Sequence, residues 1–120
     1  MRQWMLFGAI GGLMAGSVSE VLACIVEGTF RPARIGIEAG LWGLSLAVGA
    51  AAAYGPTDWV GRGLAGGGVF GLVKGGLMLA LSLAEEPWPT VMGGEVVGGL
   101  IGGVLLSYLW RTRQHPSADG

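Results

Sequence analysis

The chain has 120 residues, of which 52% are hydrophobic and only 12% are charged, and its formal net charge is −1. This length allows a single domain, and a charged fraction so far below the roughly 25% of soluble domains favours an integral membrane protein. The charge balance excludes a nucleic-acid-binding face, which needs clustered basic residues.

Four apolar segments of roughly 20 residues or more are predicted to be transmembrane helices, because about 20 helical residues cross the hydrocarbon core of a bilayer. In chain order these helices cover residues 4–26, 35–54, 60–84 and 90–110. They form one four-span membrane domain over residues 1–110, and residues 111–120 follow as a polar cytoplasmic tail.

Short connections containing prolines separate the four segments, so consecutive helices are expected to be antiparallel neighbours. Thr57 or Asp58 is positioned to cap the third helix. Tryptophans lie near the expected helix ends, where indole rings favour the membrane interface. They are Trp4, Trp59, Trp88 and Trp110.

Glycine occupies 25 positions and recurs at every fourth residue within the apolar segments. The rows are Gly8, Gly12 and Gly16; Gly63, Gly67, Gly71 and Gly75; and Gly94, Gly98 and Gly102. In a soluble helix each glycine costs about 1 kcal/mol relative to alanine, whereas in a bilayer this spacing lets helix backbones approach closely. The predicted fold is therefore all-α, with four transmembrane helices in two antiparallel hairpins packed through small-xxx-small (glycine-zipper) faces.

Arginines set the expected orientation. Arg2, Arg62, Arg111 and Arg113 fall on one side of the membrane, and Arg31 and Arg34 fall on the other. The positive-inside rule then places both termini in the cytoplasm, and we expect a bacterial cytoplasmic membrane.

Four ionisable residues fall inside the expected spans, where a charge costs at least about 2.5 kcal/mol and usually faces other helices or water. They are Glu20, Glu38, Lys74 and Glu95. Glu20 continues a glycine row, and Glu95 begins the row that Gly99 and Gly103 extend. We therefore expect a buried charge cluster in which Lys74 pairs with one or more carboxylates. The cluster either holds the helices together or lines a path for a proton, a cation or a cationic solute.

No constellation for catalysis or metal binding is present, so we expect neither an enzyme nor a cofactor. The only histidine, His115, lies in the polar tail. Cys24 is the single cysteine, which excludes an internal disulfide, and we expect it to be a packing residue rather than a lipid-modified one.

A shift of 57 positions aligns Pro32 with Pro89 and Glu38 with Glu95. Each half would then be a hairpin, and the two halves would be parallel repeats. Duplication and coincidence through the glycine bias both remain open at this point.

The rows at residues 63–75 and 8–16 resemble the mitochondrial inner-membrane protein-import translocase family, which shares four glycine-rich helices. The resemblance implies a four-span, helix-packed membrane fold. The longer loops and paired cysteines of that family are not present here, and its function is not carried over. From the residues we expect an accessory or scaffold subunit in the lipid bilayer, which associates with itself or with other membrane subunits. The alternative is a small channel or transporter that uses the intramembrane carboxylates.

Overall fold

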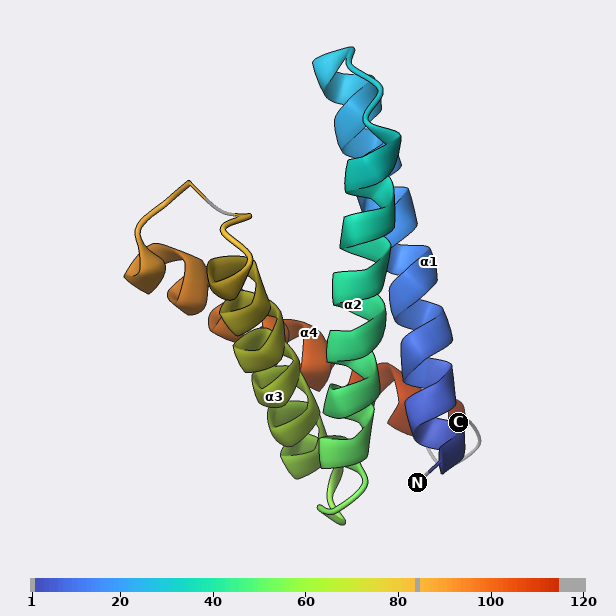
Figure 1. Ribbon diagram of the computed structural model, residues 1–120. Coiled ribbons are helices and arrows are strands. Elements are labelled where there is room, and N and C mark those ends of the chain that lie inside the picture. Colours follow the sequence, from blue (N-terminus) through green and yellow to red (C-terminus); the bar gives the residue numbers. More distant parts are fainter. Residues whose placement is uncertain (1, 84, 115–120) are drawn as a thin grey trace.

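Four α-helices make up most of the computed structural model, which describes residues 2–83 and 85–114 (Figure 1). They are α1 (Arg2–Glu27), α2 (Pro32–Ala53), α3 (Trp59–Ala80) and α4 (Trp88–Gln114). All four are long and apolar enough to cross a membrane. The protein is therefore all-helical with four candidate membrane spans. Helix α4 takes in residues 111–114 of the expected tail, and residues 115–120, with His115, lie outside the described residues.

Local sequence explains where the helices begin and end. The Asp58 side chain caps α3 by accepting a hydrogen bond from the Gly61 amide at 3.0 Å, which confirms one of the two expected caps. Helix α1 ends before Gly28, whose φ of 72° is readily adopted only by glycine. Helix α3 ends in the same way at Ser82, with a φ of 54°, so it stops four residues short of the expected span.

The helices pack in chain order. Within the described residues the backbone of α1 lies close to that of α2, α2 to α3 and α3 to α4, and no other pair of helices has its backbones this close. Figure 1 shows α1 beside α2 over their length, whereas α3 diverges from α2 away from the connection between them. The arrangement is therefore a row of helices rather than a closed four-helix bundle, and one side of α4 has no neighbour.

Glycines allow close backbone contact within the α1–α2 pair. A Cβ atom on Gly8 would lie 2.5 Å from the Leu46 carbonyl oxygen, and one on Gly16 would lie 2.5 Å from that of Glu38. Gly12 is in contact with the Trp42 carbonyl between them. Because backbone atoms cannot move aside as a side chain can, α2 can lie here only against a helix face that carries no side chain.

The α3–α4 pair repeats this arrangement. Gly63, Gly67 and Gly71 meet the carbonyl oxygens of Gly103, Gly99 and Glu95. These three carbonyls lie 57 positions after those of Leu46, Trp42 and Glu38, which is the shift seen in the sequence. The two halves of the chain therefore share one contact register, in which a glutamate lies at the third glycine of each row.

Candidate functional site

Lys74 and Glu95 form an ion pair between α3 and α4. Lys74 Nζ lies 2.8 Å from Glu95 Oε1, and the two side chains are 7% and 23% exposed. The ammonium also lies 5.3 Å from the ring centroid of Trp42 on α2, and 3.5 Å from the sulfur of Met78. Three helices thus surround one charge, whose cost of burial is reduced by a carboxylate and by an aromatic face.

The glycine row makes this pair possible. Gly71 lies against the Glu95 backbone, and a Cβ on Gly75 would lie 3.4 Å from the Glu95 Cβ. Because neither position carries a side chain, the Glu95 backbone lies against α3 at Gly71, three residues before Lys74. A larger residue at Gly71 would push α4 outward and separate the two charges.

Glu20 pairs with an arginine from the connection between α1 and α2. Arg31 Nη2 lies 3.2 Å from Glu20 Oε1 and 2.8 Å from Glu27 Oε2. The proximity of Cys24 and the attraction of the Glu27 and Glu20 carboxylates outweigh desolvation and raise the pKa of Arg31 above its ordinary value. Arg31 is therefore a permanent counterion for the buried Glu20. Cys24 itself is buried, as expected for a packing residue.

Glu38 also has its own counterion. Arg34, one turn earlier in α2, places Nε 3.6 Å from Glu38 Oε1 and donates a hydrogen bond from Nη2 to the Leu83 carbonyl at 3.4 Å. Glu38 is buried, and Arg34 connects it to the end of the segment that follows α3. This contact links the two halves of the chain.

Lys74 thus has one of the expected carboxylate partners, whereas the other two carboxylates pair with arginines. Lys74 pairs with Glu95, and among the described residues no ion pair joins it to Glu20 or Glu38. The physical reason is that each of these two carboxylates has a nearer arginine. Arg31, in the connection between α1 and α2, pairs with Glu20, and Arg34, one turn earlier in α2, pairs with Glu38. From the sequence, Arg31 and Arg34 were considered only as residues at the membrane surface that set the orientation. The four-residue spacing of Arg34 and Glu38 was the signal that could have revealed their pairing.

The structure also separates the glycine rows. Those on α1 and α3 lie against neighbouring helices, whereas a Cβ on Gly94, Gly98 or Gly102 would meet nothing within 4 Å. Helix α4 faces α3 with the adjacent row of Glu95, Gly99 and Gly103. The row that begins at Gly94 is thus free of contacts within the described chain.

An open groove of about 210 Å³ lies at the beginning of α4 and extends to Glu95 of the ion pair. It is lined by Met78, Glu86, Thr90, Val91, Gly94 and Glu95. Its carboxylates can bind or exchange a proton or accept hydrogen bonds from a cation. No group of three His, Cys, Asp or Glu side chains that could hold a metal ion occurs in residues 2–83 and 85–114.

Comparison with protein-family models, curated proteins and solved structures gave no match to this chain.

Proposed function

We propose that the chain is a non-catalytic accessory or scaffold subunit, which assembles through α4 into a homo-oligomer or a larger membrane complex. Its helices form two antiparallel hairpins, α1–α2 and α3–α4, each held by a glycine-zipper face and by its own ion pairs. Both termini lie in the cytoplasm of a bacterial cell, in accord with the positive-inside rule.

One observation carries this proposal. The row Gly94, Gly98 and Gly102 has the spacing of the packed rows but has no partner within the chain. Small residues at helical spacing let membrane helices associate, because close approach adds van der Waals contact that lipid chains do not supply. A helix from another chain could pack against this open face of α4.

Gly98→Leu is expected to convert the assembled protein to monomers while leaving the fold intact. The leucine side chain would fill the row, and its Cβ would meet no other atom of the same chain within 4 Å. The subunit number can be measured by analytical ultracentrifugation in detergent. Gly93→Leu is the matched control, because it adds the same side chain at another open position on α4 that lies off the row. A monomeric wild-type protein without a co-purifying partner, or a Gly98→Leu variant that assembles normally, would contradict the proposal.

A small channel or transporter for protons, cations or a cationic solute is a second candidate, and the groove beside Glu95 favours it. Glu86, in the connection between α3 and α4, and Thr90 line that groove together with Glu95. A cation would therefore meet polar groups as it approaches Glu95. Intramembrane carboxylates are frequent proton carriers in transporters.

For transport, Glu95→Gln is expected to abolish proton flux into liposomes that contain a pH-sensitive dye. The amide keeps the shape of the carboxylic acid but cannot release a proton. Glu85→Gln should transport normally, because Glu85 is exposed in the connection and does not line the groove. Circular dichroism would verify that each variant is folded. Unchanged flux in the Glu20→Gln, Glu38→Gln and Glu95→Gln variants would rule out transport through the carboxylates.

A further inference from the structure

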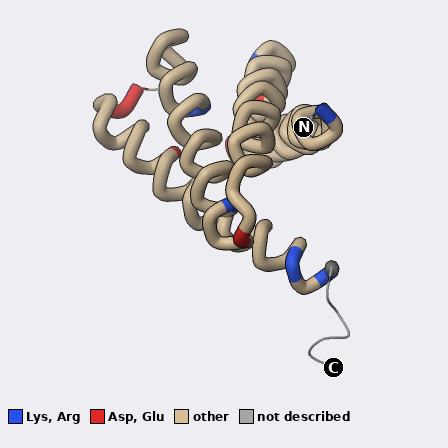
Figure 2. The backbone as a smooth tube through the Cα atoms, turned by 90° about the horizontal axis from the view of Figure 1, so that it is seen from below, with Lys and Arg blue, Asp and Glu red and all other residues tan. Residues whose placement is uncertain are grey.

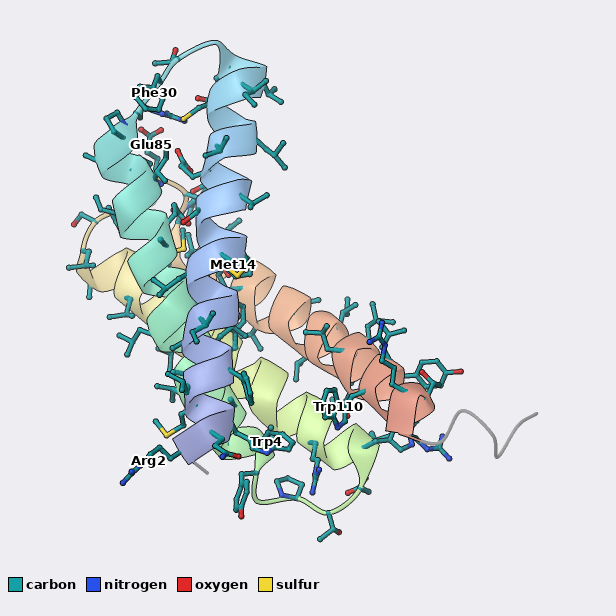
Figure 3. All side chains as sticks on the ribbon, turned by 90° about the vertical axis from the view of Figure 1, so that its right-hand side faces the viewer. Arg2, Trp4, Met14, Phe30, Glu85 and Trp110 are labelled. Atoms are coloured by element: carbon teal, nitrogen blue, oxygen red, sulfur yellow. The ribbon has the colours of Figure 1, made fainter. Side chains whose placement is uncertain are left out.

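The arginines at the two ends of the protein differ in their pairing. Arg31, Arg34 and Lys74 all have carboxylate partners. The remaining four Lys and Arg residues form no ion pair with a described carboxylate, and all four lie toward the end of the protein where α1 begins and α4 ends. They are Arg2, Arg62, Arg111 and Arg113. Figure 2 shows basic segments near the N and C labels, and Figure 3 places Arg2, Trp4 and Trp110 at the end opposite Phe30 and Glu85.

Two of these arginines line one open groove between the beginning of α3 and the end of α4. The groove has a volume of about 310 Å³ and is lined by Thr57, Asp58, Trp59, Arg62, Ser107, Trp110 and Arg111. The Ser107 hydroxyl donates a hydrogen bond to the Trp59 carbonyl at 2.5 Å, which ties the two helices together on this side. The groove therefore lies where α3 and α4 are joined by this hydrogen bond.

Both guanidinium groups are held in place. Arg62 donates from Nε to the Pro56 carbonyl at 2.8 Å, and its Cζ lies 5.4 Å from the ring centroid of Trp4. Arg111 places its Cζ 5.7 Å from the ring centroid of Trp59. Neither of these contacts neutralises the charge, and the terminal nitrogens of Arg62 form no side-chain hydrogen bond with a described residue.

The charge of the groove selects its ligand. Two guanidinium groups and the Asp58 carboxylate leave a net charge of +1, and Asp58 is already engaged by the Gly61 amide. A phosphate diester carries one negative charge and offers oxygen atoms that guanidinium groups bind well. The chemistry of the groove therefore matches a single phosphodiester.

We propose that this groove binds the phosphate of an anionic membrane lipid. Trp59 and Trp110 are at the helix ends, where indole rings lie at the level of lipid headgroups. Leu106, one turn inward from Trp110 on α4, is 64% exposed and offers an apolar surface to an acyl chain. A soluble phosphate would make no use of that surface. Basic pockets between membrane helices bind lipid headgroups in this manner.

The test is native mass spectrometry of the full chain in detergent with added phosphatidylglycerol or phosphatidylcholine. We expect preferential retention of phosphatidylglycerol. Arg111→Gln should lower the retained fraction about fivefold, the effect of removing one basic group from an anionic lipid site. Arg113→Gln is the matched control, since it removes an equal charge two residues later in α4 from a side chain that does not line the groove. It should leave retention close to the wild-type value, because Arg113 does not line the groove.

Three outcomes would overturn the proposal. One is equal retention of both lipids, and another is an equal loss in the Arg111→Gln and Arg113→Gln variants, which would indicate diffuse attraction. The third is displacement of phosphatidylglycerol by millimolar glycerol 3-phosphate, which would identify a site for a soluble phosphate. Arg62→Gln gives an independent check on the groove from α3, and circular dichroism would verify that all three arginine variants retain their helices.

Discussion

Gly67→Leu is expected to separate α3 from α4 and to destabilise the packing of these two helices. Gly67 lies against the Gly99 carbonyl, and a Cβ there would also lie 3.1 Å from the Gly103 Cα. All of these atoms belong to the backbone, so no side chain can turn aside to make room. Overpacking costs about 1–3 kcal/mol where side chains can adjust, and here the loss should reach or exceed the upper value.

The measurement is the free energy of unfolding in detergent, followed by tryptophan fluorescence during titration with a denaturing surfactant. Gly76→Leu is the control, because it adds the same side chain to the same helix where a Cβ meets nothing within 4 Å. It should be neutral or slightly stabilising, since leucine has the higher helix propensity. Equal stability of the two variants would show that α3 does not pack through the Gly67 face.

Lys74→Met should destabilise the protein by about 3 kcal/mol, because it leaves Glu95 without its counterion where α3 packs against α4. This value is the lower end of the range for broken buried pairs, since Glu95 keeps 23% exposure. The double variant Lys74→Met with Glu95→Gln should recover most of the loss, because removing both charges also removes their desolvation cost.

The same unfolding titration, applied to the four members of this double-mutant cycle, gives the coupling energy between the two side chains. A double variant that is no more stable than Lys74→Met alone would show that the loss comes from packing against Trp42 and Met78. Charge would then contribute little to the contact between α3 and α4.

The sequence predicted the number and position of the helices well, because hydropathy and prolines report them directly. It placed the end of α3 too late, since Leu81 and Leu83 extend the apolar pattern past Ser82, where the chain turns. A serine with positive φ is uncommon, so composition gave no sign of the turn. Only the surrounding backbone hydrogen bonds define the end of this helix.

The sequence predicted which charged residues would lie within the helices, but not which partner each of them would have. Gly94 and Glu95 each begin a row of small residues four positions apart, and the two rows lie on neighbouring faces of one helix. Sequence spacing is the same for both, so only the way α4 is turned toward α3 decides which row packs and which carboxylate Lys74 meets. Whether Arg31 and Arg34 can contact Glu20 and Glu38 likewise depends on the path of the chain between α1 and α2.

The ion pairs lie within α1–α2 and within α3–α4, and this has a consequence for insertion into a membrane. Inserted alone, α3 would carry an uncompensated Lys74 into lipid, and α4 would carry Glu95. Entering the bilayer together, the two helices present a nearly neutral unit, and Arg31 can offset Glu20 in the first hairpin in the same way. Insertion of α3 together with α4, and of α1 together with α2, would thus avoid exposing an unpaired charge to lipid.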